Sequence, residues 1–204
     1  MARRCSTRPM AWTASPMAAS GRPRAAEPSS HPHIVRRKKT MTDPAWIVVA
    51  RALIGTREVP GVGNSPVIMK MAEGLGSKIL GIAYGGDHVP WCGLFAAHCI
   101  NAIGLKPPPI AIRASAWATW GVAVRPCVGA VLVFSRPGGG HVGFYVGEDP
   151  VAFFVLGGNQ GDAVKIIRIE KNRMVASRWP AGKAVTSTAV VIKGEGGALS
   201  RNEA

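Results

Sequence analysis

Residues 87–104, DHVPWCGLFAAHCINAIG, predict a buried helix that begins at a cysteine. The run after Trp91 is mostly apolar, and Gly104 ends it ahead of three prolines at 107–109. A cysteine at a helix N-terminus faces unpaired backbone N–H groups and the positive end of the helix dipole, which favour the thiolate form. Free cysteine is also one of the residue types found most often in protein cores. Cys92 is therefore a candidate nucleophile, with an ordinary core residue as the alternative.

The net charge of +14 is unevenly distributed along the 204 residues. Residues 1–40 hold nine Lys and Arg against one acidic residue, have no periodic apolar pattern, and end in a basic run at 36–39. Such a segment buries too little surface to offset its ordering entropy, so we expect a disordered basic tail, with Met41 as an alternative start. The rest of the chain holds sixteen basic residues against ten acidic ones. This moderate excess suits any polyanion, and we expect no nucleic-acid partner.

The sequence shows neither a convincing export signal nor a membrane span. The best candidate signal, residues 10–20, contains Pro16 and has no Leu, Ile or Val. No apolar run approaches the roughly 18 residues that a membrane span requires. We therefore expect synthesis in the cytoplasm without a clear signal peptide.

From Met41 onward, predicted helices come first and predicted strands second. Helical periodicity, with Asp43 as the first N-cap, predicts helices over 43–55, 65–76 and 92–104 and a helical turn over 115–120. Apolar runs bounded by Gly, Pro and Asp predict strands over 130–134, 141–146, 151–156 and 164–169. This order indicates an α+β domain over 41–180 with an antiparallel meander. The weakly patterned residues 181–204 are expected to form a mostly loose tail.

The four cysteines show no metal-binding or disulfide pattern. They lie at 5, 92, 99 and 127, with no CxxC spacing and no histidine at a ligand spacing. Cys99 falls two helical turns after Cys92, roughly 10.5 Å away, which is too far for a disulfide. Cys99 and Cys127 lie among apolar residues and are expected in the core. We expect no metal site and no organic cofactor.

A thiol nucleophile needs a general base, and His141 is the best placed of the five histidines. His98 follows Cys92 by six residues and points away around the helix, whereas His88 lies in a loop without an evident scaffold. Two others lie in the tail. His141 opens the strand-like stretch GGGHVGFYVG, in which Gly143 leaves room beside the imidazole. The alternative is a histidine at a strand end with no catalytic role.

A third residue should hold the imidazole by its other nitrogen. Asn159 ends the next predicted strand, in VAFFVLGGNQGD, where an antiparallel neighbour would place it beside His141. The side-chain carbonyl of Asn159 can accept the ring N–H and fix the tautomer. Asn159 is equally well explained as a turn residue after two glycines, and Gln160 and Asp162 are nearby alternatives for the same role.

The motifs PWCGLF, GGGHVGFYVG and VLGGNQGD, together with EVPGVGN, ASAWATWG and RWP, resemble the NlpC and CHAP superfamily of papain-like cell-wall cysteine peptidases, and in particular its small prophage-associated members. The likeness runs in consistent order over residues 43–180. It implies a papain-like fold in which the nucleophile begins a helix that packs on an antiparallel sheet. It assigns Cys92 as nucleophile, His141 as base and Asn159 as the orienting residue. Gly93 departs from the pattern, in which alanine or serine commonly follows the cysteine.

This resemblance implies an enzyme that hydrolyses amide bonds of peptidoglycan, within the stem peptide or between sugar and peptide, as an endolysin does at the bacterial cell wall. It implies no cofactor, peptidoglycan as the partner, and a monomer. Two alternatives stay open. A secreted antibacterial amidase toxin would require an immunity protein that blocks the cleft at Cys92. A catalytically silent wall-binding or phage structural module would need no reactive thiol.

Residues near the predicted nucleophile are candidate substrate contacts. Asp87 and Trp91 flank it, and Trp117 and Trp120 in ASAWATWG would supply an aromatic wall. Residues three apart share a helix face, so core packing is the alternative for at least one of these two tryptophans. The loop REVPGVGN is a further candidate for shaping the cleft.

Overall fold

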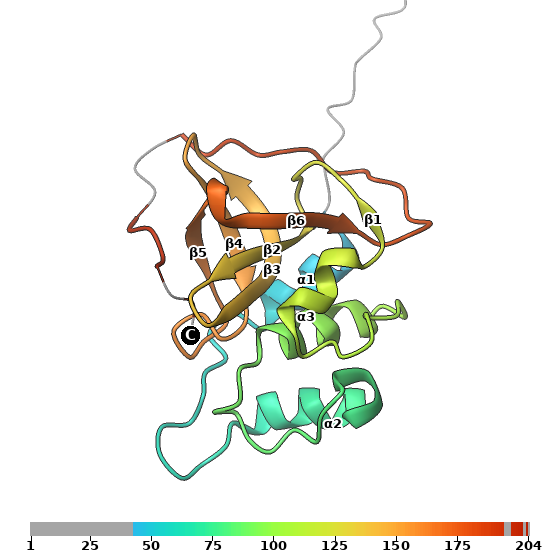
Figure 1. Ribbon diagram of the computed structural model, residues 1–204, viewed down its shortest axis with the longest axis vertical. Coiled ribbons are helices and arrows are strands. Elements are labelled where there is room, and N and C mark those ends of the chain that lie inside the picture. The colour runs from blue at the N-terminus through green and yellow to red at the C-terminus, as the bar shows by residue number, and fades with distance from the viewer. Residues whose placement is uncertain (1–42, 194–196, 202, 204) are drawn as a thin grey trace, which may run out of the picture. The chain divides into compact units, whose positions relative to one another are not determined.

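The computed structural model describes residues 43–193, 197–201 and 203, all within one compact unit that begins at Thr40 (Figure 1). The tail expected over 1–40 lies outside the described residues. Within those residues, three α-helices and a short 3₁₀ helix come before a six-stranded antiparallel sheet. The predicted α+β class is therefore confirmed.

The helices lie close to their predicted positions, with two local differences. Their bounds are Ala45–Ala52 (α1), Pro66–Leu80 (α2), Cys92–Asn101 (α3) and Ala114–Thr119 (the 3₁₀ helix η1). Asp43 does not cap α1; it accepts a hydrogen bond from Arg51 at 2.6 Å, and Pro44 takes the cap position. Gly76 interrupts α2 with a φ of 70° instead of ending it. Across the described residues, none of the helices combines the length and the apolar character needed to span a bilayer.

The sheet has the strand order β1-β6-β2-β3-β4-β5, and every neighbouring pair is antiparallel. The bounds are Val122–Ala123 (β1), Val131–Arg136 (β2), Gly139–Glu148 (β3), Ala152–Gly157 (β4), Lys165–Glu170 (β5) and Met174–Trp179 (β6). The four predicted strands correspond to β2–β5. Sequence patterning misses β1, which is two exposed residues, and β6, whose burial does not alternate regularly. The predicted antiparallel meander is confirmed for β2-β3-β4-β5, and the two strands that were not predicted extend the sheet beyond β2, with β6 between β1 and β2.

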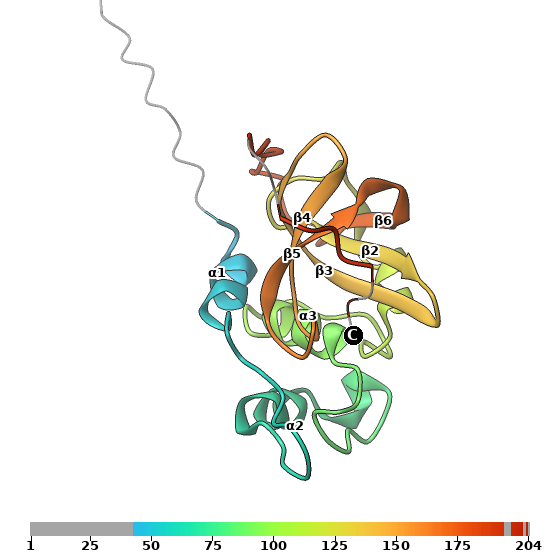
Figure 2. The same cartoon turned by 90° about the vertical axis from the view of Figure 1, so that its left-hand side faces the viewer.

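Helix α3 lies in the middle of the domain, between α2 and the sheet (Figures 1 and 2). Most of its residues are buried, as the apolar run predicts. Phe95 of α3 packs on Phe144 of β3, with 6.0 Å between the ring centroids. This packing holds the start of α3 against the strand that carries His141.

Several of the described residues after β6 are attached to the sheet, although residues 181–193, where a loose tail was expected, are mostly exposed and form no helix or strand. The backbone of Glu148 in β3 donates to Val190 and accepts from Ile192, each at 2.8 Å. Further along, the N–H of Ser200 donates to the carbonyl of Arg168 in β5 at 2.8 Å. Backbone hydrogen bonds make these attachments, so a hydrophobic pattern does not reveal them.

Candidate active site

Cys92, the first residue of α3, lines a groove of about 470 Å³, here called the thiol groove. The other walls are residues between 112 and 118, the end of β2, the turn at 138–140 and Val175 of β6. Only 5% of Cys92 is exposed, so the groove reaches a thiol that is otherwise packed in the core. A substrate that enters the groove therefore meets Cys92.

Gly93 allows α3 to start close to a neighbouring segment. A Cβ at this position would lie 2.3 Å from the carbonyl oxygens of both Ala111 and Ile112. Real Cβ atoms do not approach other atoms so closely, so neither alanine nor serine fits without a shift of the backbone. The glycine that departs from the NlpC and CHAP pattern is thus required by the packing of this chain.

His141 lies on β3 directly before Val142, a residue whose backbone contacts the sulfur of Cys92. The backbone N–H of Val142, the residue after His141, donates a hydrogen bond to that sulfur. His141 is 1% exposed, so its imidazole is enclosed by the protein. Gly143 makes room for β4 and not for the imidazole, because a Cβ there would lie 2.6 Å from Val155. The start of α3 and the strand that carries His141 therefore meet at the Cys92 sulfur, and the pairing of Cys92 with His141 stays a prediction.

The imidazole is held by Gln160. Oε1 of Gln160 lies 2.9 Å from Nε2 of His141. The amide nitrogen of Gln160 donates to the backbone carbonyls of Val155, at 3.3 Å, and Lys165. Because both partners of that nitrogen are acceptors, the orientation of the amide is fixed and Oε1 must accept the ring proton. His141 therefore carries its proton on Nε2, which leaves Nδ1 unprotonated and able to act as a base.

Asn159 forms the turn that delivers Gln160 to the site. Its φ of 52° lies in the left-handed region, which asparagine tolerates better than most residues. The assignment of Asn159 as the orienting residue is thus corrected, since the next side chain makes the contact with His141. Strand alternation identifies the correct loop, but it does not give side-chain directions within a left-handed turn.

Gly157, the last residue of β4, keeps open the space that this contact needs. A Cβ there would lie 2.6 Å from Oε1 of Gln160 and 3.1 Å from Nε2 of His141. At the next position, Gly158, a Cβ would lie 2.7 Å from the ring of Trp91. The two glycines of VLGGNQGD therefore let the loop approach both the imidazole and the start of α3.

Burial dominates the protonation of both reacting groups. It raises the pKa of the Cys92 thiol, although backbone N–H groups around the sulfur and the charge of Arg136 act in the opposite direction. It lowers the pKa of His141 to about 4, against smaller opposing contributions from Glu203 and from the hydrogen bond to Gln160. At neutral pH the resting pair is a neutral thiol and a neutral imidazole. Desolvation thus outweighs the preference for thiolate that the helix N-terminus alone would give.

Asp87 and Trp91 brace the upstream loop instead of facing the thiol groove. Asp87 is 2% exposed and accepts the backbone N–H groups of Val59 and Ser65 at 3.0 and 2.7 Å. Trp91 is fully buried and donates its indole N–H to Glu58 at 2.7 Å. The loop EVPGVGN thus supports the residues just before Cys92, and neither predicted contact offers a surface to a substrate.

Trp117 and Trp120 form an edge-to-face pair with ring centroids 5.3 Å apart. Trp117 is fully buried and donates to the carbonyl of Ala111 at 3.0 Å. Trp120 is only partly buried and packs against the core. From this segment, Ala114, Ser115 and Ala118 line the thiol groove in place of the predicted aromatic wall.

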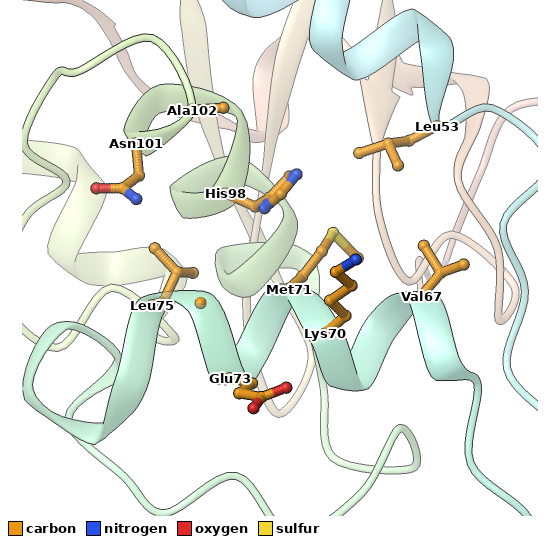
Figure 3. A pocket seen from close by; sticks show the side chains of 10 residues that line it. Leu53, Val67, Lys70, Met71, Glu73, Leu75, His98, Asn101 and Ala102 are labelled. Carbon is orange, nitrogen blue, oxygen red and sulfur yellow. The ribbon is translucent and has the colours of Figure 1, made fainter.

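A larger cavity of about 720 Å³ lies beside the other end of α3, between α3, α2 and the end of α1; it is here called the helix cavity (Figure 3). His98 reaches it from α3 and points toward Met71 of α2, with Leu53 across the cavity. Burial lowers the pKa of His98. The lining residues include no cysteine, so this cavity offers His98 no thiol partner.

Cys99 and Cys127 are buried free thiols, as predicted. In the part of the chain that the structure describes, no group of three or more His, Cys, Asp or Glu side chains is arranged to hold a metal ion. No protein-family model, curated protein or solved structure matches the chain. What the site can do therefore follows from its own side chains: a thiol at the wall of a groove, and on the strand that contacts this thiol a neutral imidazole of fixed tautomer.

Proposed function

We propose that the chain is a peptidoglycan hydrolase that cleaves an amide bond by a Cys-His-Gln mechanism. The proposal rests on the hydrogen bond between Gln160 and His141, because His141 belongs to β3, the strand that contacts the Cys92 sulfur. A histidine of fixed tautomer next to a thiol is the arrangement that acyl transfer to a cysteine requires. Gln160 takes the orienting role for which the sequence favours Asn159.

The proposed reaction consists of two acyl transfers. The Cys92 sulfur attacks the carbonyl carbon of the substrate amide while Nδ1 of His141 takes the thiol proton. The imidazolium gives that proton to the amide nitrogen as the C–N bond breaks, so the amine leaves and a thioester remains. His141 then takes a proton from water as the water oxygen attacks the thioester carbon. The sulfur leaves as the C–S bond breaks, recovers the proton from His141, and the carboxylic acid is released.

The neutral resting pair is compatible with this sequence of steps. Burial disfavours both ions, so the proton moves during the attack and the imidazolium exists only transiently. Nε2 of His141 keeps its proton throughout, and Gln160 remains bound to it. The backbone N–H of Cys92, at the start of α3, stabilises the oxyanion of the tetrahedral intermediate.

Peptidoglycan is proposed as the substrate from the motif likeness to NlpC and CHAP peptidases. Each motif carries one member of the site: PWCGLF holds Cys92, GGGHVGFYVG holds His141 and VLGGNQGD holds Gln160. Arg113 and Arg136 line the thiol groove, and their charges favour stem peptides, which carry carboxylates. The proposed place of action is the bacterial cell wall.

Digestion of purified sacculi tests the proposal. The wild type should release fragments, and mass spectrometry of the new ends separates cleavage within the stem peptide from cleavage between sugar and peptide. His141→Ala should release none, whereas Cys99→Ala, which removes a thiol from the core, should retain the activity. A wild type that binds sacculi without releasing fragments would identify a silent wall-binding module and overturn the proposal. Release that survives in His141→Ala would overturn the mechanism.

A further inference from the structure

The segment 197–203 brings a carboxylate to the loop that holds His141. The carbonyl oxygen of Glu203 accepts the backbone N–H of Gly161 at 3.1 Å, and Gly161 directly follows Gln160. The same segment is fastened to β5, where Leu199 and Ser200 contact the backbone of Arg168. Glu203 is thus attached to the orienting loop, although it is 43 residues after Gln160 in the sequence.

The side chain of Glu203 is fully buried and ionised. Both carboxylate oxygens accept hydrogen bonds from Arg173, at 2.9 and 2.8 Å, and one also accepts from the hydroxyl of Ser200 at 3.1 Å. Burial alone would raise the pKa of Glu203, but these hydrogen bonds and the nearby His141 lower it. A buried charge of this kind is costly unless it is paired, and Arg173 supplies the pair.

Charges of both signs act on the His141 imidazole. Glu203 favours its protonation, whereas Arg136 of β2 and Arg173 of η2 (Lys171–Arg173) oppose it. Gln160 binds Nε2 of the ring. An imidazolium that forms here during a reaction would meet two arginines, and Glu203 is the group that compensates for them.

We propose that Glu203 is a positioning residue, which fastens the loop carrying Gln160 and places a negative charge where the His141 imidazolium forms. The inference rests on the proposed function, because it assigns Glu203 a part in the same proton transfer. Arg173 has two roles in this arrangement: it holds the carboxylate in place and it limits the basicity that the carboxylate gives to His141.

Titration of the His141 ring by NMR tests this arrangement without relying on hydrolysis. Glu203→Gln keeps the size of the side chain and removes its charge, so the pKa of His141 should fall below the wild-type value of about 4. At pH 4 the wild-type ring should be about half protonated, and the Glu203→Gln ring should be mostly neutral. Arg173→Gln removes a positive charge and should move the midpoint upward. The double variant should fall between the two single variants.

An electrostatic role and a purely structural role of Glu203 predict shifts of the His141 midpoint in opposite directions. If Glu203 only packs the segment, Glu203→Gln loosens the site and the midpoint rises toward the ordinary value of 6.5. A rise in Glu203→Gln, or an unchanged midpoint, overturns the proposal. The control is Glu148→Gln, which removes a carboxylate from an ion pair with Lys171 at 2.8 Å and should leave the His141 titration unchanged.

Hydrolysis of sacculi adds a second readout. Activity requires the unprotonated ring, so the acid limb of kcat/KM should move to lower pH in Glu203→Gln, together with the ring midpoint. The plateau should fall about tenfold, because a weaker base takes the thiol proton less readily. An acid limb that stays in place while the ring midpoint moves overturns the catalytic part of the proposal. If the wild type fails to release fragments, the proposed function fails, and the ring titration still decides the contact between Glu203 and His141.

Discussion

The thiol groove and the helix cavity lie beside opposite ends of α3. His98 lines the helix cavity, whereas Gly140, the residue before His141, lines the thiol groove. The helix cavity is the larger, at about 720 against 470 Å³, yet its histidine, His98, faces apolar residues and the ends of long side chains. In the part of the chain that the structure describes, no side chain hydrogen-bonds to His98, whereas Gln160 holds His141 on the strand that contacts the Cys92 sulfur. The comparison teaches that the larger cavity is not the one with a thiol and an oriented histidine on its neighbouring elements, so cavity size alone does not select the candidate site.

The thiol groove and the helix cavity should differ most in the effects of Cys92→Ala and His98→Ala on activity. Cys92→Ala should lower the release of sacculus fragments by at least about a thousandfold, because Cys92 is the one thiol among the described residues that line the groove. His98→Ala should leave the rate within about twofold, since the helix cavity takes no part in the reaction. Fragment release per enzyme measures both. A loss of activity in His98→Ala with an unchanged thermal transition would move the proposed site to the helix cavity.

The two histidines should also differ in how they link stability to pH. The folded-state pKa of His141 is about 4 and the ordinary value is 6.5, so the unfolded chain takes up the proton first as the pH falls. Stability should be complete above pH 6.5 and should decline toward pH 4, with a total contribution from His141 of about 3 kcal/mol.

Urea unfolding across this pH range measures that decline. His141→Asn should remove most of it, whereas His98→Ala should remove only a minor part, because His98 is less buried. An equal slope in wild type and His141→Asn would show that His141 is not buried as a neutral ring.

Substitutions of the neighbouring residues Asn159 and Gln160 should differ less in their effects on activity. Gln160→Ala removes the acceptor of the ring proton and should lower kcat about a hundredfold. Asn159→Gly keeps the left-handed turn and should cost less than about threefold. Rates on sacculi compare the two variants, and a greater loss in Asn159→Gly would restore Asn159 as the orienting residue.

The smallest effect concerns the thiols of α3. Iodoacetamide should label Cys92 roughly tenfold faster than Cys99, because Cys92 lines a groove and Cys99 is fully enclosed. Since burial raises the pKa of Cys92, its labelling should accelerate as the pH rises through 9 and should not reach a plateau near neutrality. Peptide mapping after labelling of the folded protein measures both rates. Equal labelling of the two cysteines would contradict the accessibility of Cys92.

The residues of the candidate site differ in how well the sequence predicts them. Cys92 and His141 are predictable because each stands at a fixed place in an element that apolar patterning identifies, a helix start and an inner strand. Gln160 is less predictable, since the choice between it and Asn159 depends on a left-handed residue in the turn. Glu203 escapes prediction altogether. Its position depends on backbone contacts and an ion pair with Arg173, and neither leaves a periodic pattern.

The placement of β6 fixes the order in which this domain is completed during synthesis. Val131 of β2 pairs with Arg178 of β6. Strand β2 therefore cannot pair on this side until β6 has been synthesised, after β3, β4 and β5. Closing such a long loop costs entropy before the pairing repays it, and it makes folding slow. Val175, on that late strand, is also a wall of the thiol groove. A nascent chain therefore carries its thiol well before it has a finished groove in which a substrate can reach it.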